Sequence, residues 1–152
     1  MGSPTAAWRA IVGVLSGKVP EALMLLFVRI ALAGIFWRSG QAKLEDGSWW
    51  RISEGTFELF RTEYAGVPLP PHFAAVAAAS AEHVFPVLLV LGLATRLSAL
   101  ALLGMTMMIQ IFVYPDEWWP VHSLWVALAL VLIVRGGGLL SLDYPIAGRA
   151  RQ

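Results

Sequence analysis

Four long apolar stretches dominate the pattern of hydrophobic and polar positions along the chain. A helix that crosses a bilayer needs roughly 20 mostly apolar residues. Four stretches meet this requirement, at about residues 21–39, 72–94, 97–114 and 121–135, and the last can continue to Leu140. Prolines or glycines stand beside most of their ends, as is typical of helix boundaries. The pattern predicts an all-α fold, a bundle of four transmembrane helices that forms one domain over residues 1–152.

A fifth apolar pattern precedes the first stretch. Apolar residues recur there at the spacing of one helix face: Trp8, Ile11, Val12, Leu15 and Val19. Arg9 and Lys18 lie alongside them, and an amphipathic helix with basic residues is typical of a segment that lies on a membrane surface. We therefore expect an N-terminal interfacial helix, with a mobile tail as the alternative.

The loop at residues 40–71 carries its own helical pattern. Phe57, Phe60 and Tyr64 recur at i, i+3 and i+7, and Trp49 and Trp50 precede them. Aromatic residues of this kind gather at membrane interfaces. The pattern predicts a short helix on the outer face of the bundle.

The composition strengthens the membrane interpretation and excludes several classes of protein. Hydrophobic residues make up 58% of the chain and charged residues 14%, with a mean hydropathy of +0.69. Soluble domains have about 45–50% apolar and about 25% charged residues. The net charge is +1 and the sequence contains no basic patch, so a nucleic-acid partner is not expected. The chain has no cysteine, which excludes disulfides and thiolate metal sites, and it has no P-loop or dinucleotide motif.

Basic residues are unevenly divided between the two sides of the predicted bundle. Four spans put both termini on one side, together with six basic residues: Arg9, Lys18, Arg96, Arg135, Arg149 and Arg151. The other side has four: Arg38, Lys43, Arg51 and Arg61. The positive-inside rule then predicts a multi-pass protein of the bacterial inner membrane with both termini in the cytoplasm.

Two opposite charges lie at similar predicted depth within the bundle. Arg29 lies 11 residues before Gly40, the outer end of the first span, and Glu82 lies 11 residues after Pro71, the outer end of the second. At 1.5 Å per residue, both would sit about 16 Å deep. A buried charge without a partner is costly, so we expect an ion pair between Arg29 and Glu82. The pair either fixes the register of the helices or handles a ligand or a proton.

Polar and aromatic groups in the outer half predict a ligand pocket. They are Lys43, His83, Thr106, Gln110, Tyr114, His122 and Trp125. Thr106, Gln110 and Tyr114 follow one another on a single helix face. In this interpretation Gln110 and His122 supply hydrogen-bond donors to a quinone, and Trp125 with Trp37 forms a flat wall. Hydrogen bonding between helices and anchoring at the interface are the alternative. No metal site is predicted, because Met105, Met107 and Met108 fit core packing better than Cu(I) binding.

Several segments resemble the DoxX family of small four-helix bacterial membrane proteins. They are residues 29–36 (RIALAGIF) with Gly40 and Lys43, Glu82 with residues 91–96 (LGLATR), and residues 136–143 (GGGLLSLD). The resemblance runs from about Ala22 to Tyr144, and residues 59–64 and 110–115 resemble one subgroup. It implies a link to quinol-oxidising complexes, to redox defence or to assembly, and for the subgroup to metal-stress response. Arg29, Glu82 and Lys43 match charged positions of the family.

Two function hypotheses follow. In the first, the protein is a redox-associated inner-membrane subunit that binds a quinone or a similar lipid and is not a stand-alone enzyme. In the second, it is a non-catalytic accessory or assembly factor that stabilises or recruits a partner protein. The expected partners are the lipid bilayer and a protein of the membrane or periplasm, with a second copy of the chain as a further candidate.

Overall fold

The computed structural model describes residues 4–149. Seven α-helices follow one another in this range: α1 (Pro4–Leu15), α2 (Lys18–Gln41), α3 (Glu54–Thr62), α4 (Pro71–Leu91), α5 (Thr95–Phe112), α6 (Ser123–Arg135) and α7 (Asp143–Arg149). A 3-10 turn, η1 (Pro115–Glu117), and a π-helical turn, η2 (Trp118–His122), lead into α6. The described part of the chain contains no β-sheet, which confirms the all-α prediction.

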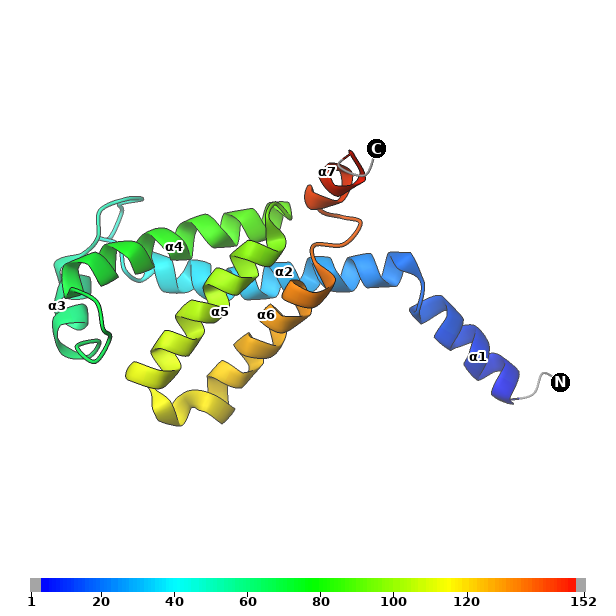
Figure 1. The fold of residues 1–152 in the computed structure, drawn as a ribbon, viewed down its shortest axis with the longest axis horizontal. Coiled ribbons are helices and arrows are strands. Elements are labelled where there is room, and N and C mark those ends of the chain that lie inside the picture. Colours follow the sequence, from blue (N-terminus) through cyan, green and yellow to red (C-terminus); the bar gives the residue numbers. More distant parts are fainter. Residues whose placement is uncertain (1–3, 150–152) are drawn as a thin grey trace.

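Four helical segments are long and apolar enough to cross a membrane. They are Lys18–Gln41, Pro71–Leu91, Thr95–Phe112 and Pro115–Arg135. They pack as one bundle, in which α4 and α6 both lie against α2 (Figure 1). The predicted four-helix bundle of a multi-pass membrane protein is confirmed, and its boundaries shift by only a few residues. The fourth segment begins earlier than expected because η1 and η2 continue the helical path ahead of α6.

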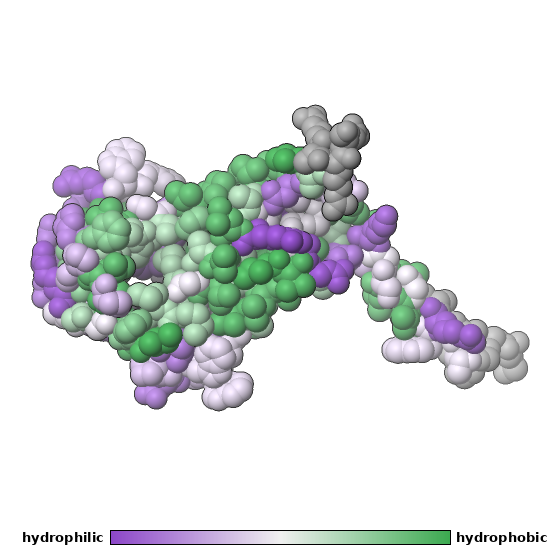
Figure 2. Space-filling view, in the orientation of Figure 1, coloured by the Kyte–Doolittle hydropathy of each residue, from purple (hydrophilic) through white to green (hydrophobic). Residues whose placement is uncertain are grey.

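The core and the outer surface of the bundle are both apolar. Six large side chains are at most 1% exposed and form the centre: Leu25, Leu32, Phe36, Leu89, Leu102 and Leu132. Other apolar side chains point outward, such as Phe27 at 71% exposure. Figure 2 shows an apolar surface over the middle of the bundle, with hydrophilic residues gathered towards α3. A helix bundle that is apolar both inside and outside is suited to a lipid environment.

Both shorter helices expected from amphipathic patterns are present. α1 leaves the bundle at the start of α2 and projects away from it (Figure 1), with Trp8 and Leu15 exposed. α3 begins where the Ser53 hydroxyl accepts a hydrogen bond from the Thr56 amide, a common helix cap. Phe60 of α3 packs against Ala74 and Ala75 of α4. α3 therefore covers the outer half of α4.

α2 and α4 are offset along the bundle. A Cβ atom added to Gly40, near the end of α2, would lie 2.8 Å from a ring carbon of His83 and 3.1 Å from Cβ of Glu82. The end of α2 therefore lies level with the middle of α4, and the first eleven residues of α4 extend beyond it. This offset determines which charges meet.

The turn between α4 and α5 is held by residues from the C-terminal segment. The carboxylate of Asp143 accepts hydrogen bonds from the backbone amides of Ala94 (2.7 Å) and Thr95 (2.8 Å), at the N-terminus of α5. Anionic groups at this end of a helix are stabilised by its unpaired amides and its dipole. The Asp143 amide in turn donates to the Gly92 carbonyl (2.9 Å). The segment after the fourth span is thus part of the fold.

Arg29 completes this arrangement from α2. Its guanidinium is fully buried and donates to the carbonyls of Leu89 (3.3 Å), Val90 (3.4 Å) and Leu140 (2.5 Å). Two of these carbonyls belong to the last turn of α4, where cations are favourable. Three of the segments that resemble the DoxX family therefore meet at one place, around the α4–α5 turn.

Candidate functional site

A buried ion pair lies where α2 ends beside α4. The Lys43 ammonium is 2.7 Å from Oε2 of Glu82 and 3.0 Å from Oε1. Glu82 is 1% exposed and Lys43 is 8% exposed. The Ser39 hydroxyl donates to Glu82 Oε1 (3.1 Å) and accepts from Lys43 (3.0 Å). Three polar groups thus satisfy one another in an otherwise apolar region.

The predicted ion pair between Arg29 and Glu82 is corrected by this geometry. Glu82 pairs with Lys43, whereas Arg29 donates to backbone carbonyls near the other end of the bundle. The predicted pair required Gly40 and Pro71 to lie at the same level. The structure instead places Gly40 beside Glu82 and His83, because α4 extends past α2. Lys43 therefore lies close enough to pair with Glu82, and Arg29 does not.

Glu82 borders two cavities. One has a volume of about 360 Å³ and is walled mainly by small or apolar side chains of α4 and α5, with Phe60 and Tyr64 from the loop side. The other has a volume of about 310 Å³ and is lined by polar groups as well, including Ser39, Tyr114 and His122. Tyr64, Glu82 and Ile109 line both cavities. Volumes of this size are typical of small-molecule sites.

His122 presents one ring nitrogen with no partner. Its Nδ1 lies 2.7 Å from Oε1 of Gln110, and the Gln110 amide nitrogen donates to the Pro115 carbonyl (2.6 Å). With the amide assigned in this orientation, Oε1 can only accept, so Nδ1 carries the hydrogen in a neutral His122. Nε2 then holds a lone pair, and no residue from 4 to 149 bonds to it. His122 therefore offers an acceptor, not the donor that the sequence suggested.

Two tyrosines stand between the cavities and the outer loop. The Tyr114 hydroxyl donates to a carboxylate oxygen of Glu63, and this hydrogen bond, together with burial, raises the pKa of Tyr114. Burial raises the pKa of Tyr64, and the negative charge of Glu82 raises it further. Both hydroxyls therefore remain protonated at neutral pH, but Tyr114 donates its one hydrogen to Glu63, so Tyr64 is the donor that a ligand could use.

The remaining predicted pocket residues occupy different places. Trp125 lines the polar cavity, with its ring centroid 5.2 Å from that of His122. His83 does not line either cavity, since it bonds to Gln41 (2.9 Å) and to the Ala79 carbonyl (2.6 Å) and lies against Trp37. Thr106 is buried and donates to the Leu102 carbonyl of its own helix (2.9 Å). The wall predicted from Trp37 and Trp125 together is therefore not formed, because Trp37 packs on His83.

Ser39 and Tyr64 are among the residues of this site that were not predicted. Ser39 links Glu82 and Lys43, and its i, i+4 spacing to Lys43 is the signal that could have identified it. Tyr64 was assigned only to an interfacial helix, yet it lines both cavities. Nothing in the sequence alone indicates that the loop folds back onto α4.

Comparison with known proteins gives a relative and a family model. A Haemophilus influenzae protein, described as an uncharacterized protein, is 29% identical over 135 residues, which cover 82% of this chain and 84% of the relative. No solved structure matches the chain. The DoxX family model matches residues 24–115, which include most of α2, all of α3, α4 and α5, and both members of the buried ion pair. The chain belongs to the DoxX family.

Proposed function

We propose that the protein is a redox-associated membrane subunit that binds a quinol, or a lipid with a similar hydroxylated ring, in the cavities around Glu82. The observation that carries the proposal is that Nε2 of His122, a residue that lines the polar cavity, has no partner among residues 4–149. A quinol hydroxyl can donate a hydrogen bond to this nitrogen. The Tyr64 hydroxyl and the Trp125 ring lie in the same wall and suit an aromatic head group.

The neighbouring apolar cavity suits the tail of such a ligand. Its wall combines small residues, Ala77, Ala78 and Ala81, with the flexible side chains of Met105 and Met108. Small and flexible side chains accommodate a branched hydrocarbon chain without a fixed shape. The ligand would then pass Glu82 and Tyr64, which line both cavities.

Binding of a short-chain quinol should depend on His122. We expect the quinol to quench tryptophan fluorescence, because Trp125 lines the cavity, and to bind about tenfold more tightly than the oxidised quinone, which lacks a donor for Nε2. His122→Leu should remove this preference and weaken quinol binding about tenfold or more. Gln110→Leu should weaken it less, because it removes only the group that fixes the histidine tautomer. Titration of the purified protein in detergent measures both affinities.

His72→Leu is the matched control. His72 stacks on Phe57, outside both cavities, so its loss should leave the affinity unchanged. Equal binding of quinol and quinone by the wild-type protein and by His122→Leu would contradict the proposal. Absence of binding by the wild-type protein would favour the accessory or assembly role, in which the cavities hold only bilayer lipid.

We further propose that the protein lies in the bacterial inner membrane with both termini in the cytoplasm. The start of α2 and the end of α6 lie at one end of the bundle, where Arg135 pairs with Glu21. Lys18 and Arg96 lie at the same end, as expected of a cytoplasmic side. A reporter enzyme that acts only in the periplasm should be inactive when fused after Gln152 and active when inserted at Gly47. Activity at the C-terminus would reverse the orientation.

A further inference from the structure

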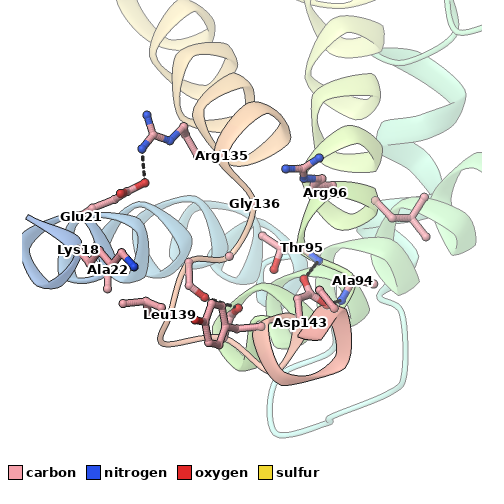
Figure 3. A pocket seen from close by; sticks show the side chains of 16 residues that line it. Lys18, Glu21, Ala22, Ala94, Thr95, Arg96, Arg135, Gly136, Leu139 and Asp143 are labelled. Carbon is pink, nitrogen blue, oxygen red and sulfur yellow. Dashed lines mark hydrogen bonds and ion pairs between the residues drawn. The ribbon is translucent and has the colours of Figure 1, made fainter. Parts of the chain in front are cut away.

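A third cavity lies at the opposite end of the bundle from Glu82, near the termini. It is an open pocket of about 770 Å³, formed by the starts of α2 and α5, the end of α6 and the segment that leads into α7. Figure 3 shows Arg96 and Arg135 on either side of the chain at Gly136, with Lys18 beyond them on α2. Because the spanning helices begin and end here, the pocket lies at the level of a membrane surface.

The charged groups of this pocket leave an excess of cations. Three basic residues line it, Lys18, Arg96 and Arg135, together with two acids, Glu21 and Asp143. Both acids are already engaged. Glu21 pairs with Arg135, and the two oxygens of Asp143 accept the amides of Ala94 and Thr95.

Lys18 and Arg96 therefore keep their charges uncompensated. Among residues 4–149, Arg96 donates only to the Val134 carbonyl (3.2 Å), and Lys18 has no ion pair. Both are exposed, so their charged groups are accessible to a ligand. Two free cations beside one pocket suit an anion.

Thr95 provides an independent polar group. It lines the pocket and is 0% exposed, and its hydroxyl has no hydrogen-bond partner in the described chain. A buried hydroxyl without a partner costs free energy, which a bound acceptor would recover. A phosphate oxygen is such an acceptor.

The apolar neighbours of the pocket indicate the source of the phosphate. Leu97 and Leu139 line the pocket and are 63% and 37% exposed. They lie beside helices that cross the membrane, where acyl chains would cover them. A free phosphate would not cover these apolar side chains, whereas the acyl chains of a phospholipid would.

We propose that this pocket binds the phosphate head group of an anionic phospholipid, with Lys18 and Arg96 as its cations, Thr95 as a hydrogen-bond donor, and Leu97 and Leu139 against its acyl chains. Basic pockets between transmembrane helices bind anionic head groups in this way. The site is independent of the quinol site at the other end of the bundle.

Lipid binding to the delipidated full chain in detergent tests the proposal. Native mass spectrometry should show phosphatidylglycerol retained in preference to phosphatidylcholine with the same acyl chains, and phosphatidylglycerol should raise the Tm. Lys18→Gln with Arg96→Gln should weaken binding about 25-fold, because each cation near an anionic lipid contributes about fivefold. Arg51→Gln with Arg61→Gln is the matched control, because it changes the net charge equally at the outer loop and should leave binding unchanged.

Several other results would overturn the proposed lipid site. Equal retention of phosphatidylcholine, or an equal loss in the control variant, would overturn the proposal. Displacement of the lipid by millimolar glycerol 3-phosphate would assign the site to a soluble phosphate. Should the double glutamine variant lose its fold, Lys18→Arg with Arg96→Lys keeps both charges and should bind as the wild type does. Weaker binding by that variant would contradict a charge-based site.

Discussion

Glu82→Leu is expected to lower the free energy of unfolding by about 3–5 kcal/mol, since it leaves the buried ammonium of Lys43 without a counter-ion. Lys43→Met should cost a similar amount by leaving the Glu82 carboxylate unpaired. The double variant should recover much of the loss, because no buried charge remains. Thermal unfolding in detergent, followed by circular dichroism, measures all three variants.

Two controls make this cycle specific. Arg51→Met removes the partner of Glu45 in an exposed pair, with 70% and 38% of the two side chains accessible, and should cost less than about 1 kcal/mol. Arg29→Leu combined with Glu82→Leu should show additive losses, because the structure assigns the two residues to different partners. Recovery of stability in that second combination would restore the Arg29–Glu82 pair.

Gly92→Ala should be the most damaging single-methyl change in the protein. Gly92 has a φ of +68°, which a residue with a Cβ adopts only with strain. The new Cβ would lie 2.1 Å from Nη1 of Arg29 and 2.7 Å from Cα of Ser141. The guanidinium would have to leave carbonyls to which charged hydrogen bonds contribute about 1.5–3 kcal/mol each. We expect a total loss of about 3 kcal/mol or more in the same unfolding assay.

Gly34→Ala is the matched substitution inside a spanning helix. No atom lies within 4 Å of its added Cβ, so it should leave stability unchanged or raise it by about 0.5–1 kcal/mol. In an Arg29→Leu background, Gly92→Ala should cost less than in the wild type, because the contact with Nη1 has gone while the positive φ and the contacts with Ser141 remain. An undiminished cost there would assign the strain to the positive φ and to Ser141, and not to Arg29.

The elements of the fold could be predicted from the sequence because each carries its own pattern. Long apolar runs bounded by proline or glycine indicate the spans, and the i, i+3, i+7 aromatic residues Phe57, Phe60 and Tyr64 indicate α3. These signals depend on neighbours within one segment. α7 is a short helix without such a pattern, and it was not predicted from the sequence.

The partners of the charged residues could not be predicted in the same way. They depend on how far one helix slides past another, and this offset is set by the close approach of Gly40 to His83 and by α3 packing on α4. An apolar pattern is unchanged by such a slide. The sequence was enough to identify Arg29, Lys43 and Glu82 as candidate site residues, but the predicted pairing of Glu82 with Arg29 was wrong.

Whether His122 donates or accepts a hydrogen bond could not be predicted from the sequence either. The sequence placed Gln110 and His122 near each other, and the structure brings them to 2.7 Å. Whether the histidine donates or accepts depends on the Pro115 carbonyl, which fixes the orientation of the glutamine amide. Such a chain of hydrogen bonds has no sequence pattern.

The attachment of Arg29 to Leu140 has a consequence for biosynthesis. The acceptor carbonyl follows the guanidinium by 111 residues and lies beyond the fourth span. Arg29 therefore enters the bilayer in the first spanning helix to be made and receives this partner only after the fourth spanning segment has been made. A nascent chain that stops at Arg135 contains every transmembrane helix, yet it lacks both Leu140 and Asp143 at the α4–α5 turn. Such a chain keeps the Arg29 hydrogen bonds to Leu89 and Val90 but lacks the one to Leu140, so we expect it to be less stable and to be degraded faster by the proteases that clear faulty membrane proteins.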